Sequence, residues 1–208
     1  VDELIHGMIV QSGNDASIAL AEAIAGSEEA FAEMMNREAQ RLGLKNTRFA
    51  NSTGLTHPQH YSTAQDLAEL AAAVIRDFPE HYPLYSQKEY RYNNIAQFNR
   101  NRLLWTDPTV DGMKTGYTEN AGYCLITSAK RGPRRMMSVV LGTASDAARA
   151  QEAQKLLNFG FQLYDSVRVY ERSAPVSTLK VWKGSSSELK AVVARDLPDL
   201  LGDRASPL

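Results

Sequence analysis

The sequence predicts an α/β fold in which helices flank an antiparallel sheet. Apolar residues recur at helical spacing through the first 78 residues, and from about Tyr90 the period changes to that of strands. One more helix and several short strands follow. With 208 residues, 43% of them hydrophobic, the chain is long enough for one good core, or for one domain and part of another.

Three amphipathic helices are predicted in the first part of the chain. Asn14 is the expected N-cap of the first and Gly26 its end, Ser27 caps the second, and Thr63 opens a sequence close to a capping box before the third, which stops ahead of Pro79. The expected buried stripes are Ala16, Ala19, Leu20, Ala23 and Ile24; then Phe31, Met34, Met35, Ala39 and Leu42; then Leu67, Leu70, Ala71, Val74 and Ile75.

The sheet is predicted from two β-prone runs, Ala121–Lys130 and Arg135–Leu141, joined by Arg131-Gly132-Pro133-Arg134 as the turn of an antiparallel hairpin. Lys114–Tyr117 is a shorter run expected to form a neighbouring strand. Cys124, the only cysteine, excludes an internal disulfide and is expected to be a small core side chain.

A last helix is predicted after Ser145, its N-cap, with a stripe of Ala153, Leu156, Leu157, Gly160 and Leu163. Strand character returns at 169–170, 176–182 and 189–193. We therefore place a boundary near 165–169, giving a first domain at 1–167 and a second at 168–208 that is too short for an independent β domain.

The amino-acid composition argues against two classes of function, nucleic-acid binding and membrane spanning. Lys and Arg number 23 and Asp and Glu 24, so the net charge is −1 and a nucleic-acid partner is not expected. The apolar stretches are too short to span a bilayer, and the acidic N-terminus is unlike a signal peptide, so the chain itself carries no expected signal or anchor.

Two triplets carry the chemistry: Ser12-Gly13-Asn14 at the mouth of the first helix and Lys114-Thr115-Gly116 on a strand. S-D-N and K-T-G triplets accompany an S-x-x-K nucleophile in penicillin-binding proteins and β-lactamases. Taken singly, each is most often a helix cap or a strand end, so neighbouring sequence has to decide.

The neighbouring sequence resembles the D-alanyl-D-alanine carboxypeptidases, the low-molecular-weight penicillin-binding proteins. The matching stretches cover most of residues 1–165, and a later one is similar to the start of that family's C-terminal β domain. They are MIVQSGNDASIALAEAIAGSEEAFAEMMNREAQRLGLKNTRFANSTGL, YSTAQDLAELA, NRNRLL, VDGMKTGYTENAGYCLITSAKR, SVVLG and LKVWKG. The resemblance implies the serine β-lactamase and penicillin-binding-protein fold, incomplete at its N-terminus here.

The residue types suit acyl transfer from a peptide that ends in a free carboxylate. Lys114 and Thr115 would supply the cation and hydroxyl that hold the carboxylate, and Gly116 would let a substrate backbone lie against the strand. By the resemblance, Tyr117 gives one oxyanion N–H, Ser12 relays a proton to the leaving amine, and Asn14 binds the substrate's peptide carbonyl.

The family's nucleophile motif lies upstream of Ser12, and the eleven residues before Ser12 contain no serine. Ser177–Lys180 and Ser187–Lys190 have the S-x-x-K spacing, but in strands i and i+3 face opposite sides. We therefore expect this chain alone to be inactive, and its uncovered apolar faces to bind a complementary N-terminal piece or to self-associate.

The resemblance implies a serine carboxypeptidase that trims D-alanine from peptidoglycan stem peptides, is acylated by β-lactams, needs no cofactor or metal, and works in the periplasm, where the whole enzyme is attached to the cytoplasmic membrane. One alternative is a DD-endopeptidase or transpeptidase of the same fold, against which LKVWKG argues. The other is a non-catalytic protein that binds wall peptides or a partner.

Three other groups of residues are weaker candidates for functional sites. His57, His60 and His81 could suggest a metal site, but Pro58 breaks the helix that would align them, so a surface loop is expected. Asn51-Ser52-Thr53 fits a glycosylation sequon and is expected to be a turn before Gly54. The arginines at the hairpin tip, expected to be solvated, are Arg131, Arg134 and Arg135.

Overall fold

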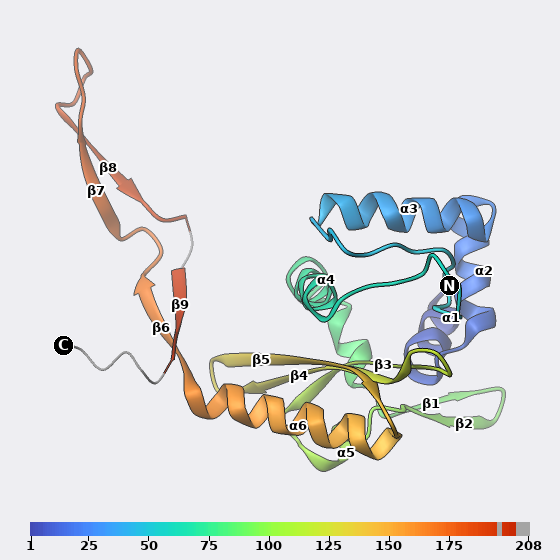
Figure 1. Cartoon of the computed structure of the whole chain (residues 1–208). Coiled ribbons are helices and arrows are strands. Elements are labelled where there is room, and N and C mark those ends of the chain that lie inside the picture. The colour runs from blue at the N-terminus through green and yellow to red at the C-terminus, as the bar shows by residue number, and fades with distance from the viewer. Residues whose placement is uncertain (195–196, 203–208) are drawn as a thin grey trace. The chain divides into compact units, whose positions relative to one another are not determined.

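The computed structural model describes residues 1–194 and 197–202, and it divides the chain into two compact units, Val1–Leu157 and Asn158–Leu208 (Figure 1). The division falls about ten residues before the boundary expected near 167/168, which stays a prediction. Among the described residues, no helix has the length and apolar character needed to cross a membrane.

The first unit opens with α1 (Asp2–His6), a π-helical turn (Gly7–Gln11), α2 (Asn14–Ala25), α3 (Glu28–Arg41) and α4 (Ala64–Asp77). The caps of α3 and α4 are confirmed: the Ser27 hydroxyl accepts from Ala30 N at 3.1 Å, and that of Thr63 from Asp66 N at 3.2 Å. The cap of α2 is one residue earlier than predicted. Gly13 is the N-cap, without a side-chain bond, and Asn14 is the first helical residue.

The predicted stripe of α2 is wrong in part. Ala16 and Ala21 are buried, but Ala19 and Ala23 are exposed and Ile24 is 59% exposed. The helix packs on α1 and α3, and those two neighbours set the buried face. Periodicity gives the width of an apolar face, whereas the position of neighbouring helices decides which part of it is covered.

The sheet of this unit has the order β3-β4-β5, from β3 (Val110–Thr118), β4 (Gly122–Arg131) and β5 (Arg134–Thr143). The hairpin predicted around Gly132 is confirmed, with a φ of +59° at that glycine. The short strand predicted at Lys114–Tyr117 is the middle of β3, which pairs with β4 and, among the described residues, has no strand on its other edge.

A second hairpin, β1 (Glu89–Tyr92) with β2 (Ile95–Phe98), was not predicted as a separate element. Its turn is Asn93-Asn94, with φ values of +47° and +61°. Two successive positive φ values are typical of a type I′ hairpin turn, and asparagine tolerates them well. After β2 come the short helix α5 (Leu103–Thr106) and then β3; a 3₁₀ turn (Tyr82–Ser86) precedes β1.

Helix α4 packs over the sheet through a core of Ala71, Tyr82 and Met113. Two arginines of the β4–β5 hairpin also face the protein, contrary to the prediction that they are solvated. Arg135 makes a two-pronged ion pair with Asp111 at 2.6 and 2.7 Å. Arg131 pairs through its Nη2 atom with Asp107 at 3.2 Å. Planar guanidinium groups match carboxylates at such sites, which ties β4 and β5 to the start of β3.

Helix α6 (Asp146–Leu163) begins where predicted, since the Ser145 hydroxyl accepts from Ala148 N at 3.1 Å. Its buried residues, however, are Arg149, Ala153, Leu157 and Phe161, whereas Leu156 and Leu163 are 48% and 36% exposed. The buried face therefore follows an i, i+4 row that starts at an arginine, a residue that the apolar pattern left out.

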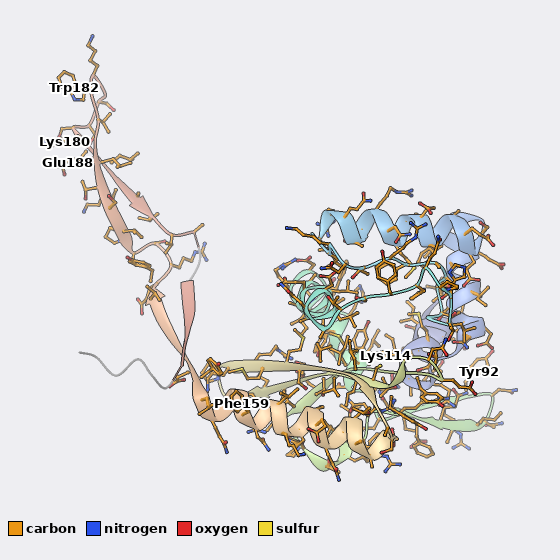
Figure 2. All side chains as sticks on the ribbon, viewed as in Figure 1. Tyr92, Lys114, Phe159, Lys180, Trp182 and Glu188 are labelled. Atoms are coloured by element: carbon orange, nitrogen blue, oxygen red, sulfur yellow. The ribbon has the colours of Figure 1, made fainter. Side chains whose placement is uncertain are left out.

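The second unit contains β6 (Tyr164–Tyr170) paired with β9 (Leu197–Gly202), and β7 (Pro175–Lys180) paired with β8 (Glu188–Val192). These strands confirm the predicted strand character. Trp182, just beyond β7, is 88% exposed at the tip of the β7–β8 hairpin (Figure 2). Ser177–Lys180 lies within β7 and Ser187–Lys190 at the start of β8, so neither S-x-x-K stretch is on a helix.

Candidate functional site

Ser12 occupies a special backbone position at the entrance to α2. It follows the π-helical turn and has φ +59° and ψ +44°, the left-handed region that serine seldom adopts. π-Helical turns and left-handed residues gather at functional sites, where the surrounding structure offsets the strain. Gly13, in extended conformation, then leads into α2, so the serine hydroxyl is set apart from the helix rather than serving as its cap.

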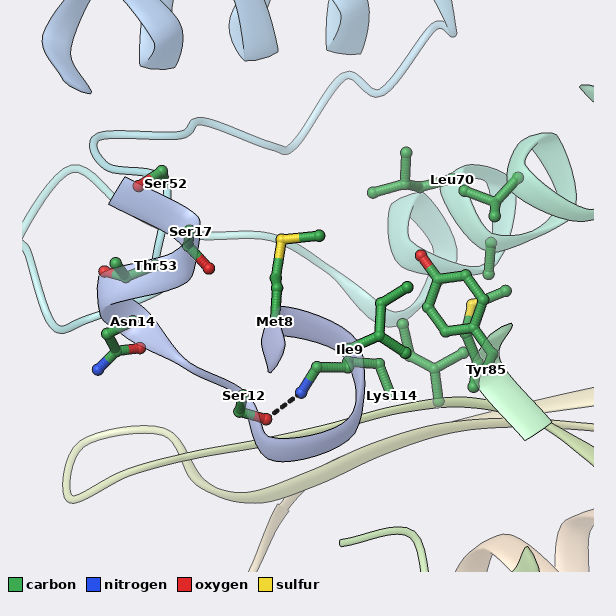
Figure 3. A pocket seen from close by; sticks show the side chains of 14 residues that line it. Met8, Ile9, Ser12, Asn14, Ser17, Ser52, Thr53, Leu70, Tyr85 and Lys114 are labelled. Carbon is green, nitrogen blue, oxygen red and sulfur yellow. Dashed lines mark hydrogen bonds between the residues drawn. The ribbon is translucent and has the colours of Figure 1, made fainter. Parts of the chain in front are cut away.

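The Ser12 hydroxyl meets the side chain of Lys114 although 102 positions separate them in the sequence. Lys114 Nζ donates to Ser12 Oγ, and also to the Thr115 carbonyl at 3.0 Å (Figure 3). Lys114 lies on β3 opposite Ile126 of β4. The two sequence motifs therefore form one constellation, with Ser12 at the helix entrance and Lys114 on the open strand.

The environment of Lys114 lowers the pKa of its ammonium group. Burial and the positive charges of Arg100 and Arg149 together lower the pKa of Lys114 to about 8, and burial is the largest of these causes. A lysine with such a pKa exchanges its proton readily near neutral to mildly alkaline pH, as a group that takes part in proton transfer must.

A cavity of about 510 Å³ opens beside this pair, and we call it the cationic cavity. Three cationic side chains line it, from Arg100, Lys114 and Arg149, and no carboxylate does among the described residues. All six site residues predicted from the sequence line this cavity: Ser12, Asn14, Lys114, Thr115, Gly116 and Tyr117. Their assembly is seen in the structure, and their individual roles stay predictions.

A second cavity, of about 330 Å³, is also lined by Lys114, and we call it the apolar cavity. It shares four residues with the cationic cavity: Ser12, Asn14, Thr53 and Lys114. The rest of its lining is mainly hydrophobic and includes Met8, Ile9, Leu70 and Tyr85 (Figure 3). Lys114 is thus in part surrounded by hydrophobic side chains.

Sequence reasoning missed Arg149. Its guanidinium donates to the carbonyls of Gly116 at 3.1 Å and Cys124 at 3.4 Å, and pairs with Asp146 at 2.5 Å. It thus joins β3 to β4 at the glycine of the K-T-G triplet. A signal was present, because Arg149 falls on the same i, i+4 row as Ala153, where an apolar residue would be expected.

Two further features of the cavity differ from expectation. Cys124 is partly exposed and lines the cavity, so its prediction as a core residue is wrong; Gly116 opposite it on β3 has no side chain to cover it. Tyr117 packs on Tyr123, with ring centroids 4.3 Å apart. Both rings therefore form a wall of the cavity beyond Gly116.

The opposite wall is a loop held in place by polar contacts. The Asn51 side chain accepts from Gly54 N at 2.8 Å, and Gly54 has a φ of +81°, which confirms the predicted turn. Ser52 donates to Glu28 from its backbone at 3.0 Å and from its hydroxyl at 2.6 Å. Nearby, His60 belongs to the same loop region and accepts from Ala50 N at 3.2 Å.

The fold and site can be compared with known proteins. The model of the D-alanyl-D-alanine carboxypeptidase family, peptidase family S11, matches residues 1–145. This chain belongs to that family. D-alanyl-D-alanine carboxypeptidase DacC of Escherichia coli (strain K12) is 48% identical over 190 residues, which are 91% of this chain and 48% of DacC. The chain spans about half the length of the curated relatives it matches.

Solved structures of penicillin-binding proteins confirm the fold class. Penicillin-binding protein 5 from Haemophilus influenzae superposes with a TM-score of 0.92 at 41% identity, covering 99% of this chain and 60% of that one. Penicillin-binding protein D2 from Listeria monocytogenes, in its ampicillin-bound form, has a TM-score of 0.71 at 33% identity and covers 76% of this chain and 66% of that one. The predicted penicillin-binding-protein fold is therefore correct.

Proposed function

We propose that this chain carries the second and third catalytic motifs of a serine-type D-Ala-D-Ala carboxypeptidase, which removes the terminal D-alanine of peptidoglycan stem peptides through an acyl-enzyme. The observation that carries the proposal is the contact between Lys114 Nζ and Ser12 Oγ at the mouth of the cationic cavity. Membership of the family and the relatives' names support it.

The charges of the cavity suit the end of such a peptide. Of the three cationic side chains that line the cavity, Arg149 is paired with Asp146, and no carboxylate lines the cavity among the described residues. Such a lining attracts an anion, and the free carboxylate of the terminal D-alanine is one. Lys114 and the Thr115 hydroxyl would hold this group. Since β3 has an open edge at Gly116, the peptide can add alongside it as an extra strand.

The remaining roles follow from this pose. A nucleophilic serine would attack the carbonyl carbon of the scissile bond and give its hydroxyl proton to the base lysine of the S-x-x-K motif. As the C–N bond breaks, that proton would pass through the Ser12 hydroxyl to the leaving amine of D-alanine. The Tyr117 N–H would stabilise the oxyanion, and the Asn14 amide would bind the substrate's peptide carbonyl. Ser177 and Ser187 lie on the β7–β8 hairpin and are not assigned as that nucleophile.

The same cavity is proposed to take β-lactams, whose carboxylate resembles that of the peptide; the Listeria monocytogenes relative has been solved with ampicillin bound. Peptidoglycan as substrate places the proposed reaction outside the cytoplasmic membrane, in the periplasm of a bacterium that has one.

Binding of a peptide ending in L-Lys-D-Ala-D-Ala tests the site directly. NMR titration of the 208-residue chain is expected to shift the signals of Lys114 and Tyr117, and the same peptide with an amidated C-terminus is the control. Equal binding of both peptides would contradict the carboxylate pocket, because only the first carries the anion.

Acylation tests the assignment of the missing nucleophile. After incubation with a fluorescent penicillin, the chain alone is expected to show no adduct by mass spectrometry. A chimaera in which the amino-terminal segment of Escherichia coli DacC precedes this chain is expected to be acylated and to release D-alanine. A stoichiometric adduct on Ser12 or Ser177 of the chain alone would contradict the assignment.

A further inference from the structure

The segment between β2 and α5 carries the motif Asn99-Arg100-Asn101, for which the proposed function gives no role. The side chain of Arg100 lines the cationic cavity. Its two neighbours point inward, with Asn99 7% exposed and Asn101 0% exposed. A fully buried amide is costly unless its hydrogen bonds are made, so its partners indicate why an asparagine is there.

Asn101 uses each of its polar groups. Its backbone N–H donates to the side chain of Asn99 at 2.9 Å, and its side-chain oxygen accepts from Leu103 N at 3.2 Å. Its side-chain Nδ2 donates to the carbonyl of Gly112 on β3 at 3.1 Å. Asn99 in turn donates to the carbonyls of Gln87 and Lys88, at 3.0 and 2.8 Å. The two asparagines therefore fasten the Arg100 segment on both sides.

Gly112 is a closely packed residue of β3, two residues before Lys114. Its carbonyl also accepts from the buried hydroxyl of Thr127 at 2.6 Å. A Cβ on Gly112 would lie 2.4 Å from the hydroxyl oxygen of Tyr82, so a side chain cannot be added there without displacement. The bond from Asn101 thus joins the backbone that carries Arg100 to a closely packed part of the strand that carries Lys114.

We propose that Asn101 is a positioning residue, which sets the separation between the guanidinium of Arg100 and the ammonium of Lys114 across the cationic cavity. Two cations repel each other, and without the link the Arg100 segment would relax away from β3. Among the described residues, the Lys114 amine donates to the Ser12 hydroxyl and the Thr115 carbonyl, and the charges that shift its pKa are those of Arg100 and Arg149. Of these, only Arg100 is held through Asn101.

The position of Arg100 affects the pKa of Lys114. Arg100 is the second largest cause, after burial, of its lowered pKa, so displacement of Arg100 should raise it. The role of this lowered pKa in catalysis rests on the proposed function. The positioning itself does not, because it can be measured in the free chain without substrate.

The experiment titrates the Cε carbon of Lys114 by NMR in the ¹³C-lysine-labelled 208-residue chain, with the signal assigned by its loss in Lys114→Met. Asn101→Ala and Arg100→Gln are each expected to raise the pKa of Lys114 by about 0.5 or more. The double variant is expected to raise it no further than Arg100→Gln alone, because Asn101 acts through Arg100.

Two controls separate positioning from a loss of stability. Thr127→Val removes the other donor to Gly112 and leaves the Asn101 link in place. Asn36→Ala breaks a similar side-chain bridge, to the backbone of Phe49 at 2.8 Å. Both are expected to lower the free energy of unfolding and to leave the pKa of Lys114 unchanged.

Should Asn101→Ala fail to fold, Asn101→Ser replaces it, since serine keeps a polar group in the buried position but is too short to reach the Gly112 carbonyl. An unchanged pKa of Lys114 in a folded Asn101 variant overturns the proposal. So does a double variant whose shift equals the sum of the two single shifts. Peptide binding that fails while these shifts appear would count against the proposed function alone.

Discussion

The two cavities that meet at Lys114 have opposite character. The cationic cavity is lined by three charged side chains and the open edge of β3, whereas the apolar cavity is lined mainly by hydrophobic side chains of the first helices, α4 and the sheet. Both include Ser12 and Lys114. The amine therefore lies on a boundary between a region that excludes water and a region that attracts anions.

This difference separates two requirements of the proposed chemistry. The apolar side removes water from Lys114 and so lowers its pKa, which makes its proton available. The cationic side keeps a positive charge for a carboxylate even when Lys114 is neutral, because Arg100 stays charged, whereas the charge of Arg149 is partly balanced by Asp146. A site with only one kind of lining would supply either proton transfer or anion binding, but not both.

Removing the shared amine should have the largest effect. In the chimaera with the DacC segment, Lys114→Ala is expected to slow acylation by a fluorescent penicillin about 100- to 1000-fold, since loss of one electrostatic contact at such a site costs about 2.7–4 kcal/mol in the barrier. Lys130→Ala, at an exposed position on β4, is the matched control. Acylation of Lys114→Ala at the wild-type rate in stopped-flow would remove Lys114 from the site.

The pH dependence of stability should show the next largest effect. The pKa of Lys114 is about 8 in the folded chain, whereas that of a solvent-exposed lysine, as in the unfolded chain, is 10.5. Between these two pH values the unfolded state therefore binds more protons than the folded state. Stability must then rise with pH across that window, as the penalty for burying the charge disappears. Relative to Lys114→Met, the wild-type chain should gain about 2 kcal/mol in free energy of unfolding between pH 7.5 and pH 10.

Urea unfolding of both chains at the two pH values measures this gain. Taking the difference from Lys114→Met cancels other titrations, such as that of Tyr82, whose pKa burial raises to about 12. A difference between the chains that stays constant from pH 7.5 to pH 10 would show that Lys114 titrates as an ordinary lysine.

Local signals allowed much of the fold to be predicted. Ser27, Thr63 and Ser145 cap helices as predicted because a cap depends on a few neighbouring residues. The turn at Gly132 is predicted correctly for the same reason, since it depends on a short local sequence. Whether an apolar residue is covered depends on distant segments, so Ile24 and Leu156 were assigned to buried stripes although both are exposed.

The site shows the same limit. The two triplets marked Ser12 and Lys114, and the structure brings them into contact. Arg100 and Arg149 escaped notice because their roles depend on tertiary position: an arginine is ordinarily a surface residue, and only the fold turns these two toward Lys114. Arg135 was likewise read as solvated, although it pairs with Asp111 across the sheet.

The smallest predicted effect tests the apolar side of the comparison alone. Val74 of α4 lines the apolar cavity, and Val74→Thr keeps the shape of the side chain while adding a hydroxyl that attracts water. Better hydration of the cavity should raise the pKa of Lys114 by less than about 1, because the cationic side is untouched. Val139→Thr on β5 makes the same change at a similarly half-buried position that lines neither cavity. Lysine NMR titration should then show a shift for Val74→Thr and none for Val139→Thr. Equal shifts in the two variants would mean that general loosening of the fold, rather than the dryness of this cavity, governs the proton of Lys114.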